Sequence, residues 1–357
     1  MTDTLQDGGS EQREPGGVPL LSVRDLSVTI DTEDGVVDAV DRVSWSVDRG
    51  GILGIVGESG SGKSVSCLSL VGLLPRRRTT VGGAAMFDGS DLLTRSEREL
   101  NAIRGARIAM IFQDPLTSLH PLASVGGQLR EAITLHHRMP RAQARERAVE
   151  MLTKVGIPDP ERRMSAYPHE LSGGMRQRVM IAMALINDPA LLIADEATTA
   201  LDVTTQAQIL DLLRDLCRRA NSAIVLITHD LGVVAEVCDH VVVMYAGRVV
   251  ERGTVEAVLE RPSHPYTWGL LDSMPSVDPT AARARTIGGA PPSLLHPPAG
   301  CRFHPRCPYA MDRCRTEVPP AHRAPDGDLD HATACHLGDA ELVAGSRRSS
   351  VLSTVAW

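Results

Sequence analysis

The chain has 357 residues, 43% hydrophobic and 23% charged, which is enough for one large globular domain or two modest ones. Its formal net charge of -7 excludes a generic nucleic-acid-binding protein, because such proteins neutralise phosphates with an excess of Lys and Arg. No run of about 18 apolar residues occurs, and residues 1–18 lack the apolar core of a signal peptide. We therefore expect a cytoplasmic protein that acts at a membrane only through partners.

The order of predicted elements indicates one α/β domain with a small appendage. Residues 1–18 and 341–357 are polar or small and are expected to be tails. Between residues 19 and 261, short β-branched runs alternate with amphipathic helical patterns and no internal repeat is evident, which predicts one domain built on a parallel sheet. Proline becomes dense afterwards, so residues 262–340 are expected to be loop-rich. The expected strands cover residues 54–56, 108–112, 191–194, 223–228 and 240–245, and the clearest helices cover residues 141–155 and 203–220.

A glycine-rich loop follows the apolar run 52–56 and precedes a helical stretch, which is the context of a phosphate-binding loop. Its glycines let the backbone wrap around phosphates, Lys63 can reach the β- and γ-phosphates of ATP, and the Ser64 hydroxyl can ligate Mg²⁺. The alternative is an ordinary turn rich in glycine and serine. The predicted ATP-binding residues are Gly57, Glu58, Ser59, Gly60, Ser61, Gly62, Lys63 and Ser64.

Two carboxylates, Asp195 and Glu196, end the apolar run that begins at Leu191. Buried acids at the end of a buried strand are costly unless a cation or partner compensates them. Asp195 suits the Mg²⁺ shell through water, and Glu196 suits a general base that polarises the attacking water. Without the phosphate loop, an acidic edge between strand and loop would be a plausible alternative for the pair.

Residues 171–178 read Leu-Ser-Gly-Gly-Met-Arg-Gln-Arg. A glycine-rich turn that opens a helix is an anion site, although taken alone it could be an ordinary helix start. Placed between the phosphate loop and the paired carboxylates, the segment resembles the signature of ABC ATPases. Three further residues match that family in its order: Gln113 resembles the Q-loop, Asp202 the D-loop and His229 the switch histidine.

The resemblance implies an ABC-type nucleotide-binding domain with a mixed core sheet, an antiparallel β edge and a helical subdomain that carries the signature. It implies an ATP hydrolase in which His229 contacts the γ-phosphate and positions the water with Glu196. Gln113 would ligate Mg²⁺ and sense a transmembrane subunit, and Asp202 would couple two sites across a dimer. The signature would contact ATP held by a second subunit through Ser172, Gly173 and Gly174.

The sequence departs from the family pattern in two places. The family usually stacks adenine on an aromatic ring upstream of the phosphate loop, but Val36 and Val37 occupy the matching region here. Trp45 lies within a strand pattern and is expected in the core. Ala197 stands where the family often has proline, and we expect little effect from it.

Four of the seven cysteines, Cys301, Cys307, Cys314 and Cys335, crowd into the proline-rich segment. Four thiols there suit a metal or cluster that supplies the core which such a segment lacks. Thiolate ligation fits zinc or a [4Fe-4S] cluster, and the absence of tight Cys-x2-Cys pairs favours the cluster. Four free thiols are the remaining alternative.

Residues 264–271 and 301–308 narrow the resemblance, because they look like the C-terminal extension of oligopeptide and dipeptide importer ATPases. That resemblance implies a [4Fe-4S] cluster and a peripheral position on the cytoplasmic face of the membrane. It also implies three kinds of partner: a related but distinct ATPase subunit, two transmembrane permeases and an extracytoplasmic binding protein. A nickel or oligosaccharide importer, or a soluble ABC ATPase outside transport, remains an alternative.

Overall fold

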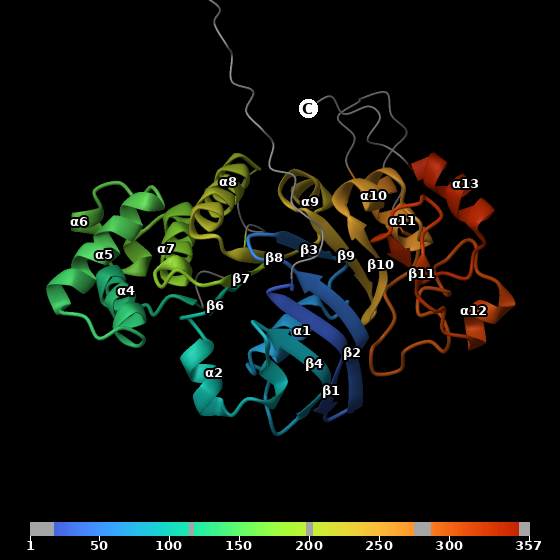
Figure 1. Cartoon of the computed structure of the whole chain (residues 1–357), viewed down its shortest axis with the longest axis horizontal. Helices are drawn as coiled ribbons and strands as arrows, with labels where there is room; N and C mark the ends of the chain where they lie inside the picture. The colour runs from blue at the N-terminus through green and yellow to red at the C-terminus, as the bar shows by residue number, and fades with distance from the viewer. Residues whose placement is uncertain (1–17, 114–117, 198–202, 275–286, 350–357) are drawn as a thin grey trace, which may run out of the picture.

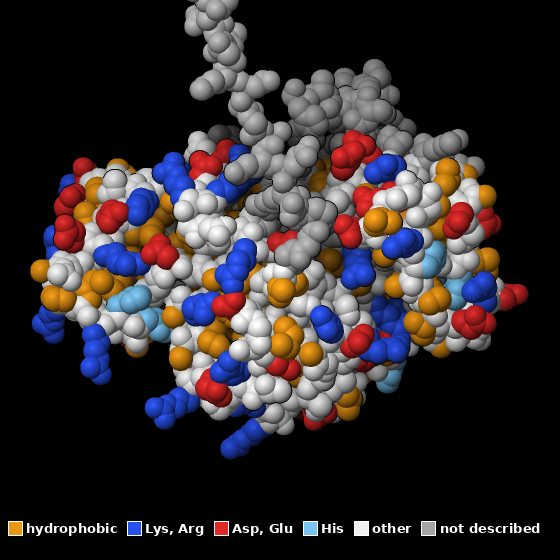
Figure 2. Space-filling view, in the orientation of Figure 1, with side chains coloured by type: hydrophobic (Ala, Val, Ile, Leu, Met, Phe, Trp, Pro, Cys, Tyr) orange, Lys and Arg blue, Asp and Glu red, His pale blue; other side chains and the backbone are white. Residues whose placement is uncertain are grey.

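The computed structural model describes residues 18–113, 118–197, 203–274 and 287–349. Figure 1 shows a central α/β region, with a helical lobe on one side and the C-terminal extension on the other. No helix within these ranges is long and apolar enough to span a membrane. On the face drawn in Figure 2, acidic and basic side chains are interspersed over the described residues.

The main sheet has strand order β11-β12-β10-β9-β3-β8-β7-β6. Its central strands, from β9 to β6, are parallel and read as continuous apolar runs because both faces of the sheet are covered. The C-terminal strands pair antiparallel, so the sheet is mixed. The five predicted strands are confirmed. The bounds are β3 Ile52–Val56, β6 Ile108–Ile111, β7 Leu191–Asp195, β8 Ala223–Thr228, β9 His240–Tyr245, β10 Arg248–Thr254, β11 His322–Arg323 and β12 Ala332–Thr333.

A second, antiparallel sheet has the order β2-β1-β4-β5. Its buried side chains share one core with β3 and with helix α1 (Lys63–Leu70), which positions the phosphate loop beneath this sheet. Trp45 is 3% exposed in that core, as the sequence predicted. The bounds are β1 Leu21–Thr32, β2 Gly35–Val47, β4 Thr79–Phe87 and β5 Ser90–Asp91.

The helical lobe holds α4 (Val125–Thr134), α5 (Arg141–Lys154), α6 (Pro160–Arg163) and α7 (Gly173–Leu185). Apolar faces of α4, α5 and α7 pack into one core with β6 and β7, so the lobe is continuous with the main sheet. Around the sheet lie α2 (Glu97–Ile103), α8 (Val203–Ala220), α9 (Leu231–Val237) and α10 (Val255–Glu260). Helices predicted at residues 141–155 and 203–220 are confirmed as α5 and α8.

The extension contains α11 (Pro265–Asp272), α12 (Asp312–Thr316) and α13 (Asp339–Ser349). Helix α13 corrects the expectation of a tail from residue 341 onward. Leu342 is fully buried, and a Cβ at Gly345 would lie 2.0 Å from the ring of Trp268. Among the residues of α13 whose burial is described, Leu342, Gly345 and Ser346 are buried, which is too few apolar positions for an amphipathic pattern.

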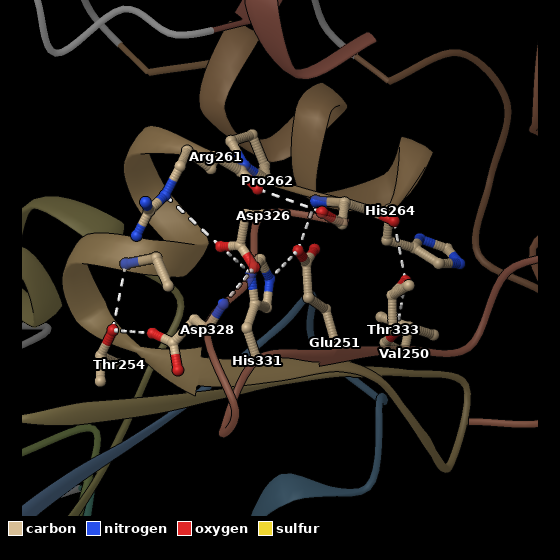
Figure 3. A network of polar contacts seen from close by, with 12 residues as sticks. Val250, Glu251, Thr254, Arg261, Pro262, His264, Asp326, Asp328, His331 and Thr333 are labelled. Atoms are coloured by element: carbon tan, nitrogen blue, oxygen red, sulfur yellow. Dashed lines mark hydrogen bonds and ion pairs between the residues drawn. The ribbon is translucent and has the colours of Figure 1, made fainter. Parts of the chain in front are cut away.

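A buried ionic network, drawn in Figure 3, joins the extension to strand β10. His331 is fully buried, and its Nε2 lies 2.8 Å from Glu251 Oε1 while its Nδ1 lies 2.7 Å from Asp326 Oδ2. Thr333, two residues further on, donates to the carbonyl of Ser263 at 2.7 Å. A desolvated charge must keep its partners, so this network holds β12 and the segment before it against β10.

We expect the stability of the fold to depend on pH through this network. Burial opposes a charged imidazole, yet Glu251 and Asp326 raise the pKa of His331 above its ordinary value. Burial also raises the pKa of Glu251. The folded state therefore binds more protons than the unfolded state. The contribution of His331 is complete below about pH 6.5 and is lost as the pH rises through its raised folded pKa.

His331→Gln should lower the free energy of unfolding by about 3 kcal/mol near pH 6, because one partner of a buried ionic group is removed. The loss should shrink as the pH rises through the raised folded pKa of His331, since the wild type loses that contribution over this range. Urea unfolding over a pH series from about pH 6 upward measures it, with the exposed His240→Gln as the control. Equal losses throughout the series would contradict a charged His331.

Candidate functional site

The phosphate loop needs glycine at two positions. Gly57 has φ +151°, and a Cβ there would lie 2.1 Å from the carbonyl oxygen of Met244. Gly62 has φ +94°, and its Cβ would lie 2.5 Å from the carbonyl oxygen of Ala39. By contrast, nothing lies within 4 Å of a Cβ at Gly60. The loop is thus fixed against the fold at both ends and open at its middle, as a phosphate cradle requires.

The side chain of Lys63 binds back to the start of the phosphate loop. Its Nζ donates to the carbonyl oxygens of Gly57 at 2.6 Å and Glu58 at 2.9 Å. Burial lowers the pKa of Lys63, and the nearby carboxylates of Glu196, Asp195 and Glu58 oppose that shift. An ammonium held this way is a positive charge at the centre of an anion site.

Asp195 is the last residue of β7, and the Ser64 hydroxyl donates to its Oδ1 at 2.8 Å. Burial raises the pKa of Asp195, and Glu196 adds to the shift while Ser64 and Lys63 oppose it. A carboxylate and a hydroxyl side by side are the oxygen ligands that Mg²⁺ takes in nucleotide sites.

Glu196 has φ +46°, and its N–H donates to the carbonyl of Ile227 at 2.9 Å. A non-glycine residue in this region costs about 1 kcal/mol or more and persists where the surroundings hold it. Gln113 Nε2 donates to Glu196 Oε2 at 2.8 Å, and His229 Nδ1 lies 3.6 Å from Oε1. Two polar side chains from separate strand ends therefore converge on one carboxylate.

A cavity of about 530 Å³ unites these groups. It is large enough for a nucleotide phosphate chain and is lined by both polar and apolar surface. The structure brings together most of the predicted ATP site, and the lining residues are Glu58, Ser59, Gly60, Ser61, Gly62, Lys63, Ser64, Val65, Gln113, Glu196 and His229.

The signature residues lie elsewhere, at the N-terminus of α7. Ser172 caps the helix by accepting from the N–H of Met175 at 3.3 Å. Gly173 faces open space, and the cavity lining in the described part of the chain includes none of the three signature residues. Asp202 lies outside the described residues. The described structure therefore places the signature residues outside the cavity that the phosphate loop lines.

The expected adenine region carries no aromatic ring. Val36 on β2 is 56% exposed and Val37 is partly buried, whereas Trp45 is in the core. The two valines can offer an apolar surface but no stacking partner.

The four extension cysteines converge on one small cavity, although they come from different turns and α12. Burial raises the pKa of Cys307 to about 12 and that of Cys335 to about 11, with the other thiols adding to both shifts. The cavity also borders His264, Phe303, His304, Tyr309, Met311 and His336.

Four thiols are suitable ligands for a metal, but in this structure the four cysteine side chains are not arranged as a ligand shell. Within the described ranges, no three His, Cys, Asp or Glu side chains form a group that could hold a metal ion. The cavity has about 10 Å³ of free space, close to one water molecule. The described residues therefore do not show the metal or cluster site that the sequence predicted in the extension.

Two residues that contact the phosphate loop were missed by the sequence analysis. Arg306 and Tyr266 both belong to the extension, and both bind Glu58. No spacing or motif links them to the loop, because the contact spans more than two hundred residues of sequence.

Comparisons with known proteins agree with this geometry. A family described as "ABC transporter" matches residues 40–199, and one described as "Oligopeptide/dipeptide transporter, C-terminal region" matches residues 250–314. The oligopeptide transport ATP-binding protein OppD of Salmonella typhimurium is 53% identical over 316 residues, which cover 88% of this chain and 94% of that protein. The dipeptide transport ATP-binding protein DppD of Escherichia coli is 50% identical over 317 residues, which cover 89% of this chain and 96% of that protein.

Solved structures give the same picture. A dimeric ATP-binding cassette, described as a post-hydrolysis state bound to ADP and Pi, has a TM-score of 0.59 and 28% identity to this chain. The match covers 66% of this chain and 98% of that one. The matched part of this chain is therefore similar in length to the α/β region and the helical lobe taken together, without the extension.

Proposed function

Because this chain belongs to the ABC transporter family, in the group of oligopeptide and dipeptide transport ATP-binding proteins, we propose that it powers peptide import by hydrolysing ATP. The observation that carries the ATPase assignment is the convergence of Gln113 and His229 on Glu196, across one cavity from Lys63. The peptide assignment draws on the relatives and on the matched C-terminal region.

The phosphate loop holds the triphosphate of ATP. Lys63 and the loop N–H groups neutralise the β- and γ-phosphates, and Ser64, Asp195 and Gln113 provide oxygens for Mg²⁺. When bound, Mg²⁺ would supply positive charge that offsets the charge developing on the phosphates. The hydroxyl of Ser64 supports this, since Ser64 lines the cavity and its hydroxyl donates to the carboxylate of Asp195.

Glu196 polarises the attacking water and accepts its proton as the water oxygen bonds to the γ-phosphorus. The bond from that phosphorus to the bridging oxygen breaks, and ADP and Pi leave. His229 contacts the γ-phosphate, and Gln113 holds Glu196 in place until nucleotide binds. Glu196 lines the cavity and has a left-handed backbone conformation that its surroundings must hold, which supports this role.

Hydrolysis needs a second ATPase subunit, since Ser172, Gly173 and Gly174 lie away from the phosphate loop of their own chain. Two subunits would close over two ATP molecules, with Asp202 coupling the sites. Closure on binding and reopening after hydrolysis would drive the transport cycle through differential affinity for the two states.

The proposal extends to the other partners of the transporter, and membership of the family supports it. The partner ATPase is a distinct paralogue, two transmembrane permeases form the pathway, and an extracytoplasmic binding protein delivers the peptide. The chain then sits at the cytoplasmic face of the membrane as a peripheral subunit.

A [4Fe-4S] cluster held by Cys301, Cys307, Cys314 and Cys335 is part of the proposal, with one zinc ion as the alternative. When bound, such a group would supply a covalent centre to the extension. The convergence of the four thiols on one cavity supports it. Binding would require the thiols to deprotonate and the cavity to widen.

Anaerobic purification with iron, sulfide and zinc analysis tests this directly. We expect about four irons and four sulfides per chain with broad absorption near 400 nm, lost on replacing all four cysteines by serine. A single zinc would select the alternative. Metal-free protein that keeps its fold would contradict both.

Uptake by cells that lack this chain tests the proposed substrate. We expect loss of labelled di- or oligopeptide uptake, restored by the wild-type chain and not by Glu196→Gln. Restoration of nickel or oligosaccharide uptake with no effect on peptides would favour the related importers. ATP hydrolysis without any permease partner would favour a soluble ABC ATPase.

A further inference from the structure

Glu58 is the second residue of the phosphate loop, and each of its polar groups is bound by a different element. Its carbonyl oxygen accepts from Lys63 Nζ at 2.9 Å, and its N–H donates to the Tyr266 hydroxyl at 2.9 Å. Its carboxylate receives two hydrogen bonds from Arg306, at 2.5 Å to Oε2 and 3.0 Å to Oε1. The extension therefore binds both the backbone and the side chain of this loop residue.

Arg306 is a fixed and desolvated partner. Its side chain is 5% exposed, and its Nε and Nη2 donate to the carbonyl oxygens of Gly288 at 2.9 Å and Ile287 at 3.2 Å. Its Nη1 lies 3.3 Å from the Tyr245 hydroxyl. Planar bidentate pairing fixes direction as well as distance, so the carboxylate of Glu58 has one favourable position.

An arginine that joins two parts of a fold can also have a purely structural role, and Arg248 is an example in this structure. Arg248 on β10 binds Asp41 of β2 through Nε at 2.7 Å and donates to the carbonyl of Gly300 in the extension at 3.0 Å. That pair joins core and extension without lining the phosphate cavity. Arg306 differs because its partner is itself a residue of the cavity wall.

We infer that Arg306 and Tyr266 are positioning residues of the ATP site, so that the C-terminal extension sets the geometry of the phosphate loop. Glu58, at the start of the loop, is bound by Lys63 on one side and by Arg306 and Tyr266 of the extension on the other. If the contacts with the extension are lost, the backbone N–H groups of the loop can leave the phosphate-binding arrangement.

The inference rests on the proposed ATP site and deepens it. Its test compares the full chain as wild type, Arg306→Lys, Glu58→Gln, the double variant and the control Arg248→Lys. Lysine keeps the charge and removes the bidentate fork. Calorimetric titration with MgATP gives Kd for each chain, thermal unfolding gives Tm, and the assembled transporter gives KM and kcat.

We expect Arg306→Lys and Glu58→Gln each to weaken MgATP binding about tenfold, and the double variant to be no weaker than either, since both remove one interaction. KM for ATP should rise more than kcat falls. Arg248→Lys should lower Tm about as much as Arg306→Lys does, but its Kd for MgATP should stay within about twofold of the wild-type value.

Equal effects of Arg306→Lys and Arg248→Lys on Kd would overturn the inference, and so would an unchanged Kd in Arg306→Lys. Additive losses in the double variant would overturn it too, because the two side chains would then act separately. Failure of the wild-type chain to bind MgATP is a different result, since it would refute the ATP site itself.

Discussion

Glu196→Gln should lower ATP hydrolysis by about 100- to 1000-fold while MgATP still binds, because the amide cannot accept the proton of the attacking water. Glutamine keeps the shape of the side chain and can still meet Gln113 and His229. The variant should accumulate as an ATP-bound dimer, since closure needs nucleotide and reopening needs hydrolysis.

Phosphate release measures the rate, and size-exclusion chromatography with the partner subunit and MgATP measures the dimer. Glu236→Gln on α9 is the matched control, because that glutamate is exposed and is not part of the cavity lining. Hydrolysis at the wild-type rate in Glu196→Gln would refute the assignment of the general base.

The second large effect is expected at Lys63. Lys63→Met removes the charge at the centre of the phosphate loop and leaves a side chain of similar length. We expect MgATP binding to weaken about 100-fold, because the phosphates lose a buried charged partner. The loss should be smaller for ADP than for ATP, since Lys63 reaches the γ-phosphate as well.

Calorimetric titration with MgATP and MgADP measures both affinities. Lys154→Met is the control, because Lys154 forms an exposed pair with Glu150 on α5. Equal weakening of the two nucleotides would show that Lys63 does not interact with the γ-phosphate.

The ATP site could be predicted from the sequence because each of its parts is a local pattern. A buried strand, a glycine-rich loop and a helix are contiguous around Gly57 and Lys63, and the buried acids end another strand directly. Parallel strands then bring these ends to one edge of the sheet, where Gln113 and His229 reach Glu196.

The contacts of the extension could not be predicted in the same way. The pair of Arg306 with Glu58 and that of His331 with Glu251 join residues far apart in sequence. A charged residue in a proline-rich segment reads as solvated surface until tertiary structure buries it. Cysteine density did predict that the four thiols converge, but the geometry of a ligand shell depends on side-chain positions that no spacing specifies.

The most direct test of the account is ATP hydrolysis by the whole transporter in lipid vesicles. This chain, the partner ATPase and the two permeases are reconstituted, and the rate is measured with empty and with peptide-loaded binding protein. We predict that loaded binding protein stimulates hydrolysis and that Glu196→Gln in this chain removes the stimulated rate. A rate that does not respond to peptide, or that this variant leaves unchanged, would contradict the assignment of this chain as the ATPase of a peptide importer.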